Sequence, residues 1–141
     1  MTDYYRFERY GKKVPLFEGL AADDIADILS RGKTLTFNKG KTILHKGQCG
    51  NNLFVVFAGS VGIYRNERKI ARCRVGDAFG EMSLLEHLPQ EATAVAENDV
   101  RLFALSEENF NQILNRRVAV RFLLNVIHLL CRNFTIMVGD L

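Results

Sequence analysis

The stretch GDAFGEMSLL at residues 76–85 is followed closely by PQEATAVA at residues 89–96. Gly80 lets the backbone turn sharply, and we expect a short helix to follow at residues 81–86. The N–H groups at a helix start attract an anion, and Glu81 at this position can accept a hydrogen bond from a hydroxyl group. Taken alone, the pattern also fits an ordinary strand-to-helix turn with an acidic first turn.

Short segments with the period of β-strands surround this stretch. They alternate apolar and polar residues or are rich in β-branched and aromatic residues, and they cover residues 33–37, 42–44, 53–57, 61–65, 69–75, 92–96 and 100–105. Glycines and polar turns separate them. Seven or eight short strands with frequent turns predict a mainly β protein, an antiparallel β-roll or jelly-roll over about residues 33–105, and not a parallel sheet.

Helical spacing occurs on both sides of the predicted β-roll. Residues 3–10 and 22–30 are predicted to be amphipathic helices, the second ending at Gly32. After the strands, Ser106 is predicted to cap one helix, and a longer helix is expected at about residues 118–137. The chain is therefore expected to have N-terminal helices and a C-terminal helix pair.

The long C-terminal helix has more apolar surface than one β-roll is expected to bury. Its polar residues form a narrow stripe that we expect to face solvent or the rim of a partner: Arg121, Asn125, His128, Arg132 and Thr135. The apolar remainder predicts a homodimer through residues 118–137, using Val120, Leu123, Leu124, Ile127, Leu130, Phe134 and Met137. The alternative is that this apolar excess folds over the ligand pocket of its own domain as a lid.

Composition excludes several classes of protein. A chain of 141 residues with 48% hydrophobic residues suits one domain, and a net charge of +3 does not indicate a nucleic-acid binder. The three cysteines contain no CxxC pair, which argues against zinc or a disulfide framework and predicts a reducing, cytoplasmic location. We find no signal peptide, membrane span, metal-ligand spacing or catalytic triad pattern, so we expect neither an enzyme nor a membrane protein.

Over about residues 14–135 the chain resembles the cyclic nucleotide-binding domain family. The resemblance is carried by FGEMSL at 79–84 and PQEAT at 89–93, which are similar to the family's phosphate-binding cassette, and by PLFEGL at 15–20, KG at 46–47 and LFVVFAGSV at 53–61. It implies one domain, 1–141, with an N-terminal helical segment at 1–32, a β-roll at 33–105 with its cassette at 76–93, and C-terminal helices at 106–141. The implied ligand-binding residues are Phe79, Gly80, Glu81, Met82, Ser83, Gln90, Glu91, Ala92 and Thr93.

The cassette departs from the family pattern at the position of its phosphate-binding arginine. Glu81 stands where the family's glutamate binds the ribose 2′-hydroxyl, but the arginine position holds Gln90. Replacing a charged hydrogen bond by a neutral one weakens binding by about an order of magnitude, so we expect cyclic AMP to bind at micromolar levels or worse. Residues 77–99 also carry six carboxylates and no Lys or Arg. Arg72, Arg74 and Arg101 are candidates for supplying a cation, although each is also expected as a solvated strand residue.

Two hypotheses for function remain at this point. In the first, the domain is a regulatory sensor that binds cyclic AMP or cyclic GMP and signals through its C-terminal helices, with no other cofactor. In the second, it is a degenerate domain that does not bind cyclic AMP and acts through dimerisation or partner docking. Transcription factors of this family carry a helix-turn-helix after the long helix, and no such DNA-binding domain is expected before Leu141.

Overall fold

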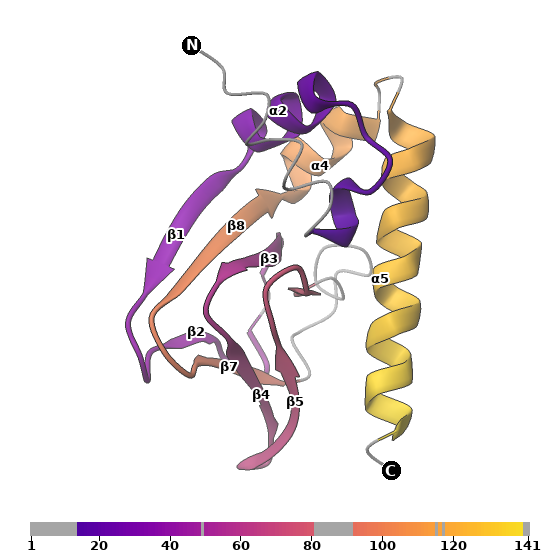
Figure 1. Ribbon diagram of the computed structural model, residues 1–141. Helices are drawn as coiled ribbons and strands as arrows, with labels where there is room; N and C mark the ends of the chain where they lie inside the picture. Colours follow the sequence, from indigo (N-terminus) through magenta and orange to yellow (C-terminus); the bar gives the residue numbers. More distant parts are fainter. Residues whose placement is uncertain (1–13, 49, 81–91, 115, 117, 140–141) are drawn as a thin grey trace.

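The computed structural model describes residues 14–48, 50–80, 92–114, 116 and 118–139, with only the backbone for 133–139. Two short N-terminal elements, the 3-10 helix η1 (Pro15–Phe17) and the helix α2 (Ala22–Arg31), precede the strands. The helices α4 (Glu107–Leu114) and α5 (Ala119–Gly139) follow them, and α5 runs along one side of the molecule (Figure 1). The predicted helices at 3–10 and 81–86 lie outside the described residues.

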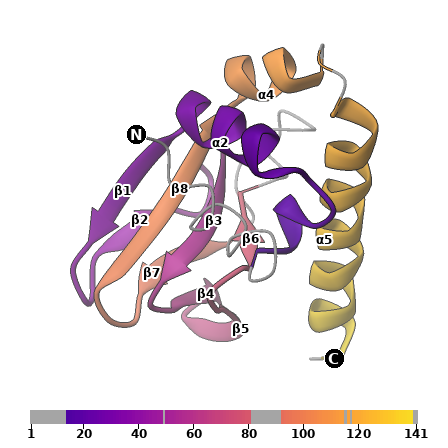
Figure 2. The same ribbon diagram turned by 45° about the horizontal axis from the view of Figure 1, so that its top comes forward.

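The strands form two antiparallel sheets of four strands each within the described residues. One sheet has the order β1 (Lys33–Phe37), β8 (Val100–Ser106), β3 (Asn52–Ala58) and β6 (Ala78–Phe79). The other has the order β2 (Thr42–Leu44), β7 (Thr93–Ala96), β4 (Val61–Arg65) and β5 (Arg68–Cys73). Figure 2 shows the helices α2 and α4 at one end of these sheets. The predicted antiparallel roll with flanking helices is therefore confirmed.

The local signals account for most element ends. The helix α2 stops before Gly32, as predicted, and the Ser106 hydroxyl accepts a hydrogen bond from the Asn109 N–H at 3.2 Å, which caps α4. The predicted strand at 69–75 is too long, because β5 ends at Cys73. Val75 lies in a turn closed by the Asp77 N–H to Arg74 carbonyl bond, and it is 46% exposed.

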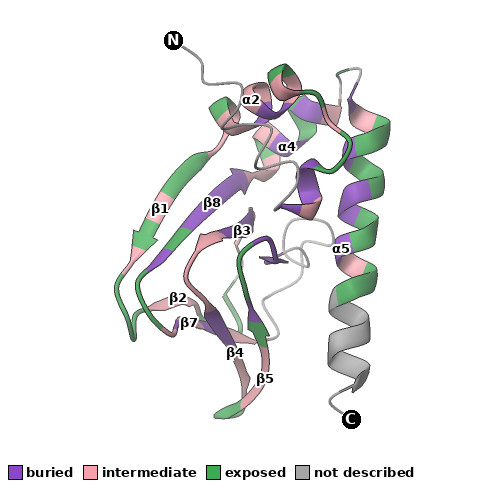
Figure 3. Ribbon diagram, viewed as in Figure 1, coloured by how far each residue is buried: buried purple, intermediate pink, exposed green. Residues whose placement is uncertain are grey.

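Two hydrophobic clusters hold the elements together. The first joins the helices to the sheet of β3 and β8, with Phe17, Ile28, Phe103, Ile113 and Phe122 among its buried side chains. The second fills the space between the sheets, with Phe54, Val61, Phe79, Ala94 and Leu102. Figure 3 shows this burial along β3, β8 and one side of α5. The sheet of β3 and β8 therefore buries apolar side chains on both of its faces.

The orientation of α5 differs from the prediction. Phe122, Val126 and Leu129 face the domain, as does Asn125, which is only 2% exposed. The Asn125 side chain donates hydrogen bonds to the carbonyls of Leu16 at 2.8 Å and Glu18 at 2.9 Å. The expectation that Asn125 faces solvent or a partner is therefore wrong, because the carbonyl groups at the end of η1 need a donor from the helix.

The other residues of the predicted polar stripe on α5 differ in their surroundings. The Arg121 side chain lies beside Gly19, and Arg132 forms an ion pair with Asp77 at 3.0 Å. His128 is exposed. Of the described residues of the predicted polar stripe, Asn125 is buried, whereas Arg121, His128 and Arg132 are exposed. An apolar face made of Val120, Leu123, Leu124 and Ile127 is exposed as well. Leu130 is partly buried against the first cluster, and the side chains of Phe134 and Met137 lie outside the described residues.

Candidate ligand site

The strand β6 positions the start of the cassette. Phe79 pairs with Phe54 of β3, and their rings stack with centroids 5.2 Å apart at an interplanar angle of 18°. Both rings belong to the cluster between the sheets, and Phe79 is 6% exposed. Of the predicted ligand-binding residues, Phe79 therefore lies in the core, where its burial anchors the backbone that leads into the cassette.

Gly80 occupies a place where a side chain does not fit. Its φ is +86°, and a Cβ atom built there would lie 2.8 Å from the carbonyl oxygen of Asn52 and 3.2 Å from Cδ2 of Phe54. Glycine is thus required both for the positive φ and for the close approach to β3. The geometry agrees with the sharp turn expected at this position.

Thr93 begins the far end of the cassette at β7. Its hydroxyl oxygen accepts a hydrogen bond from the Lys46 N–H at 3.0 Å, and its backbone pairs with Tyr64 of β4. Ala92, which precedes it, is half-buried. Since β6 and β7 belong to different sheets, the cassette connects the two sheets. Five of the predicted site residues lie between these ends and outside the described residues: Glu81, Met82, Ser83, Gln90 and Glu91.

Asp77 is a buried carboxylate directly before β6. It is 6% exposed, and it accepts a hydrogen bond from the Arg74 N–H at 2.9 Å. Its other oxygen forms the ion pair with Arg132 of α5. Sequence reasoning counted Asp77 only as one acidic residue among six. No local signal points to its partner, because Arg132 reaches it through the packing of α5.

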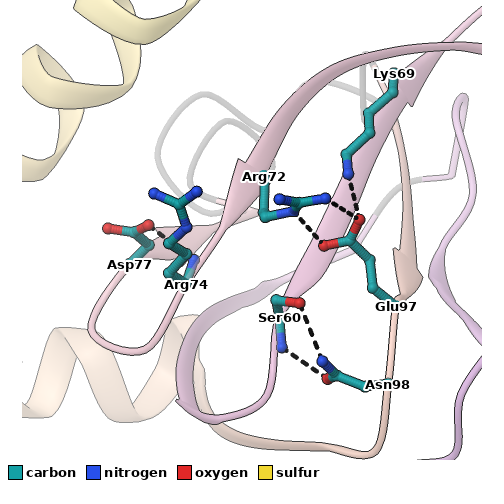
Figure 4. Close-up of polar contacts among 7 residues, drawn as sticks. All are labelled: Ser60, Lys69, Arg72, Arg74, Asp77, Glu97 and Asn98. Atoms are coloured by element: carbon teal, nitrogen blue, oxygen red, sulfur yellow. Dashed lines mark hydrogen bonds and ion pairs between the residues drawn. The ribbon is translucent and has the colours of Figure 1, made fainter.

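Glu97, just after β7, is held by two cations from β5. Arg72 donates to it through Nε at 2.7 Å and Nη2 at 3.2 Å, and Lys69 contacts it through Nζ (Figure 4). The hydrogen bond from Arg72 is the main cause that lowers the pKa of Glu97 from 4.5 to about 2, against the opposing effect of desolvation. The same pair raises the pKa of Arg72.

Several carboxylates of the acidic segment at residues 77–99 have hydrogen-bond donors or cations beside them. Asp77 and Glu97 each have a cationic partner, and Asp99 accepts a hydrogen bond from the Lys39 N–H at 3.3 Å. The remaining carboxylates, Glu81, Glu86 and Glu91, lie outside the described residues. The charge around the described ends of the cassette is therefore largely compensated.

The three arginines proposed to supply the missing cation lie in different parts of the structure. Arg72 is engaged by Glu97, and Arg101 lies on β8, which β3 separates from β6. Arg74 lies in the turn that leads into β6, beside Asp77, and is exposed (Figure 4). Of the three, Arg74 is the one that is nearest to the cassette along the chain.

No group of three or more His, Cys, Asp or Glu side chains is arranged to hold a metal ion in the described part of the chain. Among the described helices, none combines the length and the apolar character needed to cross a membrane.

Comparison with known proteins gives a consistent result. The sequence model of the family described as "Cyclic nucleotide-binding domain" matches residues 34–117, more than half of the chain. The cyclic AMP receptor protein of Thermus thermophilus is 36% identical over 110 residues, which cover 74% of this chain and 51% of that protein. The cAMP-dependent protein kinase regulatory subunit of Hypocrea atroviridis is 27% identical over 108 residues, which cover 77% of this chain and 23% of that protein.

The fold points to the same relatives. The crystal structure of the Thermus thermophilus catabolite activator protein superposes with a TM-score of 0.78 at 34% identity, covering 86% of this chain and 58% of that chain. The chain belongs to the cyclic nucleotide-binding domain family. It spans about half the length of the Thermus receptor protein (51%) and less than a quarter of the kinase subunit (23%).

Proposed function

We propose that this domain is a non-catalytic sensor that binds a cyclic nucleotide of the cyclic AMP type at the cassette and signals through its C-terminal helices. The observation that carries the proposal is Gly80, whose positive φ and contact with β3 hold the start of the cassette in a shape that only glycine permits. Glu81 follows directly in the sequence and is the proposed acceptor for a ribose hydroxyl. The names of the relatives, a cyclic AMP receptor and a cAMP-dependent regulatory subunit, support the ligand class.

The other proposed ligand contacts come from the sequence. Met82, Ser83, Gln90 and Glu91 complete the cassette together with Ala92 and Thr93. We also propose a cytoplasmic location, which is supported by the cysteine usage of the chain.

The second candidate function is a domain that has lost cyclic AMP binding and works by dimerisation or docking. Gln90 favours it, because a neutral amide replaces the arginine of the family pattern. The exposed apolar face of α5, where Val120 is 72% exposed and Ile127 is 49% exposed, offers a docking surface under either candidate. Both candidates predict a homodimer through residues 118–137, so ligand binding is what separates them.

Calorimetric titration with cyclic AMP, cyclic GMP and cyclic dinucleotides tests the proposal. We expect cyclic AMP to bind the unmodified chain in the micromolar range and Gln90→Arg to bind it roughly tenfold more tightly, because the substitution restores a charge-assisted contact. Glu91→Ala should strengthen binding further by removing a like charge. As a matched control, Gln48→Arg adds the same charge in an exposed turn and should leave the affinity unchanged.

If neither the unmodified chain nor Gln90→Arg binds any cyclic nucleotide, the sensor proposal is wrong and the docking function takes its place. Nanomolar affinity for cyclic AMP in the unmodified chain would instead show that another cation contacts the phosphate.

A further inference from the structure

The C-terminal part of α5 is connected to the strand that leads into the cassette by one described ion pair. Arg132 lies one helical turn beyond Leu129, the last fully buried side chain of α5 that the structure describes. Its Nη2 atom is 3.0 Å from Oδ1 of Asp77. The side chain of Asp77 is 9% exposed, whereas that of Arg132 is 53% exposed, so the contact joins a buried carboxylate to a half-exposed side chain of the helix.

Asp77 is firmly held by the β-roll on its other side. Its carbonyl accepts a hydrogen bond from the Val56 N–H at 2.9 Å, and the neighbouring Gly76 N–H donates to the Val56 carbonyl at 2.8 Å. Its second carboxylate oxygen accepts the Arg74 N–H. The backbone of Gly80, three residues further along the chain, lies close against β3. A displacement of the cassette start therefore displaces Asp77 or strains these bonds.

A buried carboxylate keeps its charge only where donors compensate for the lost solvation. Among the described residues, Arg132 supplies the cationic donor and the Arg74 N–H supplies the neutral one. The ion pair therefore joins the guanidinium group of α5 to the carboxylate that precedes β6. The N-terminal half of α5 has separate anchors, Phe122 and Asn125, and does not depend on this pair.

We propose that the Asp77–Arg132 ion pair is a tether by which β6 holds the C-terminal part of α5, and that it transmits occupancy of the cassette to the helix. The transmission rests on the proposed function, whereas the tether does not. Coupling of this kind is reciprocal: a ligand that shifts Asp77 changes the free energy of the helix contact, and a helix held in place changes the affinity for the ligand by the same factor.

Hydrogen exchange on the full chain, without ligand, tests the tether. In Arg132→Gln we expect roughly fivefold faster exchange both at residues 77–80 and at residues 129–136, a modest factor because Arg132 is half exposed. Residues 119–126 should be unchanged, and Arg132→Lys should recover most of the protection. The matched control is Arg116→Gln, which removes another half-exposed arginine, paired with Asp27 at 2.9 Å, and should leave both segments unchanged.

The double variant Asp77→Asn with Arg132→Gln decides whether the two ends act together. For a tether, its exchange at both segments equals that of the faster single variant. Effects confined to the segment that carries each substitution, or effects that add in the double variant, overturn the tether.

Adding cyclic AMP tests the transmission separately. We expect the ligand to change exchange at both segments in the unmodified chain, and to change only residues 77–80 in Arg132→Gln. An unaltered response of residues 129–136 in Arg132→Gln overturns the transmission. If the unmodified chain binds no cyclic nucleotide, the proposed function and the transmission both fail, while the comparison without ligand still decides the tether.

Discussion

Gly80 and Glu97 lie near the two ends of the cassette, and each owes its behaviour to a few close contacts. At Gly80 the contact is steric, between the place of a Cβ atom and the carbonyl of Asn52. At Glu97 it is electrostatic, between a carboxylate and the cations Arg72 and Lys69. A single substitution at either residue therefore tests the contact that it makes.

Gly80→Ala should lower the free energy of unfolding by about 2–4 kcal/mol, since it adds a steric clash to the cost of a positive φ. Gly40→Ala is the matched control: its φ is +88°, but nothing lies within 4 Å of the added Cβ, so only about 1 kcal/mol should be lost. Urea denaturation of the two variants measures the difference. Equal losses would contradict the close approach of Gly80 to β3.

Glu97 should make stability depend on pH in the acid range. Its pKa is lowered to about 2 in the folded chain from 4.5, so its contribution is complete above about pH 4.5 and is lost as the pH falls toward about 2. Because Arg72 is half exposed and solvent screens the pair, we expect about 1–2 kcal/mol. The unfolding free energy of the unmodified chain minus that of Glu97→Gln should show this loss. A difference that stays constant down to pH 2 would contradict it.

Among the elements, α5 has the most varied surroundings. One face, which includes Asn125, packs on η1 and α4, Arg132 contacts Asp77 just before β6, and another face is apolar and exposed. Asn125 is the polar residue most deeply placed in the packed face. Its two hydrogen bonds to the carbonyls of Leu16 and Glu18 join the two ends of the domain's chain.

Asn125→Ala should lower the free energy of unfolding by about 1–3 kcal/mol, because it leaves the buried carbonyl of Leu16 without its donor and removes the part-buried bond to Glu18. The control on the same helix is Val120→Ala, which truncates a side chain that is 72% exposed and should cost less than about 0.5 kcal/mol. Thermal or urea unfolding of both variants gives the comparison. Similar values for the two would show that the hydrogen bonds of Asn125 contribute little.

At the scale of the whole molecule, η1, α4 and β5 contact one side of α5, and its other side stays exposed (Figure 3). Leaving Val120, Leu123, Leu124 and Ile127 in water costs free energy at roughly 25 cal/mol per Å² of apolar area. A second copy of the helix would cover this face, and this is the basis of the proposed homodimer. Within the described residues, this face is directed away from the packed domain, which argues against the alternative of a lid.

Light scattering at low micromolar concentration should give a mass near twice the 16.0 kDa of the single chain. Leu123→Glu or Ile127→Glu should reduce it to 16.0 kDa by placing a charge in the interface. Val75→Glu is the matched control, because Val75 is 46% exposed, close to the 49% of Ile127, but lies in the turn before β6 and not on α5. A mass of 16.0 kDa for the unmodified chain would rule out the dimer.

Local patterns in the sequence were enough to predict the antiparallel roll, the helices α2, α4 and α5, and the turn at Gly80. Each of these depends on periodicity, capping or backbone freedom within a few residues. The partners of Asp77, Glu97 and Asn125 depended on the tertiary structure, because each lies on a different element brought close by the packing of the sheets and α5. Periodicity grouped the polar residues of α5 on one stripe, but only the tertiary structure placed Asn125 against the carbonyl groups of η1 and Arg132 beside the buried carboxylate of Asp77.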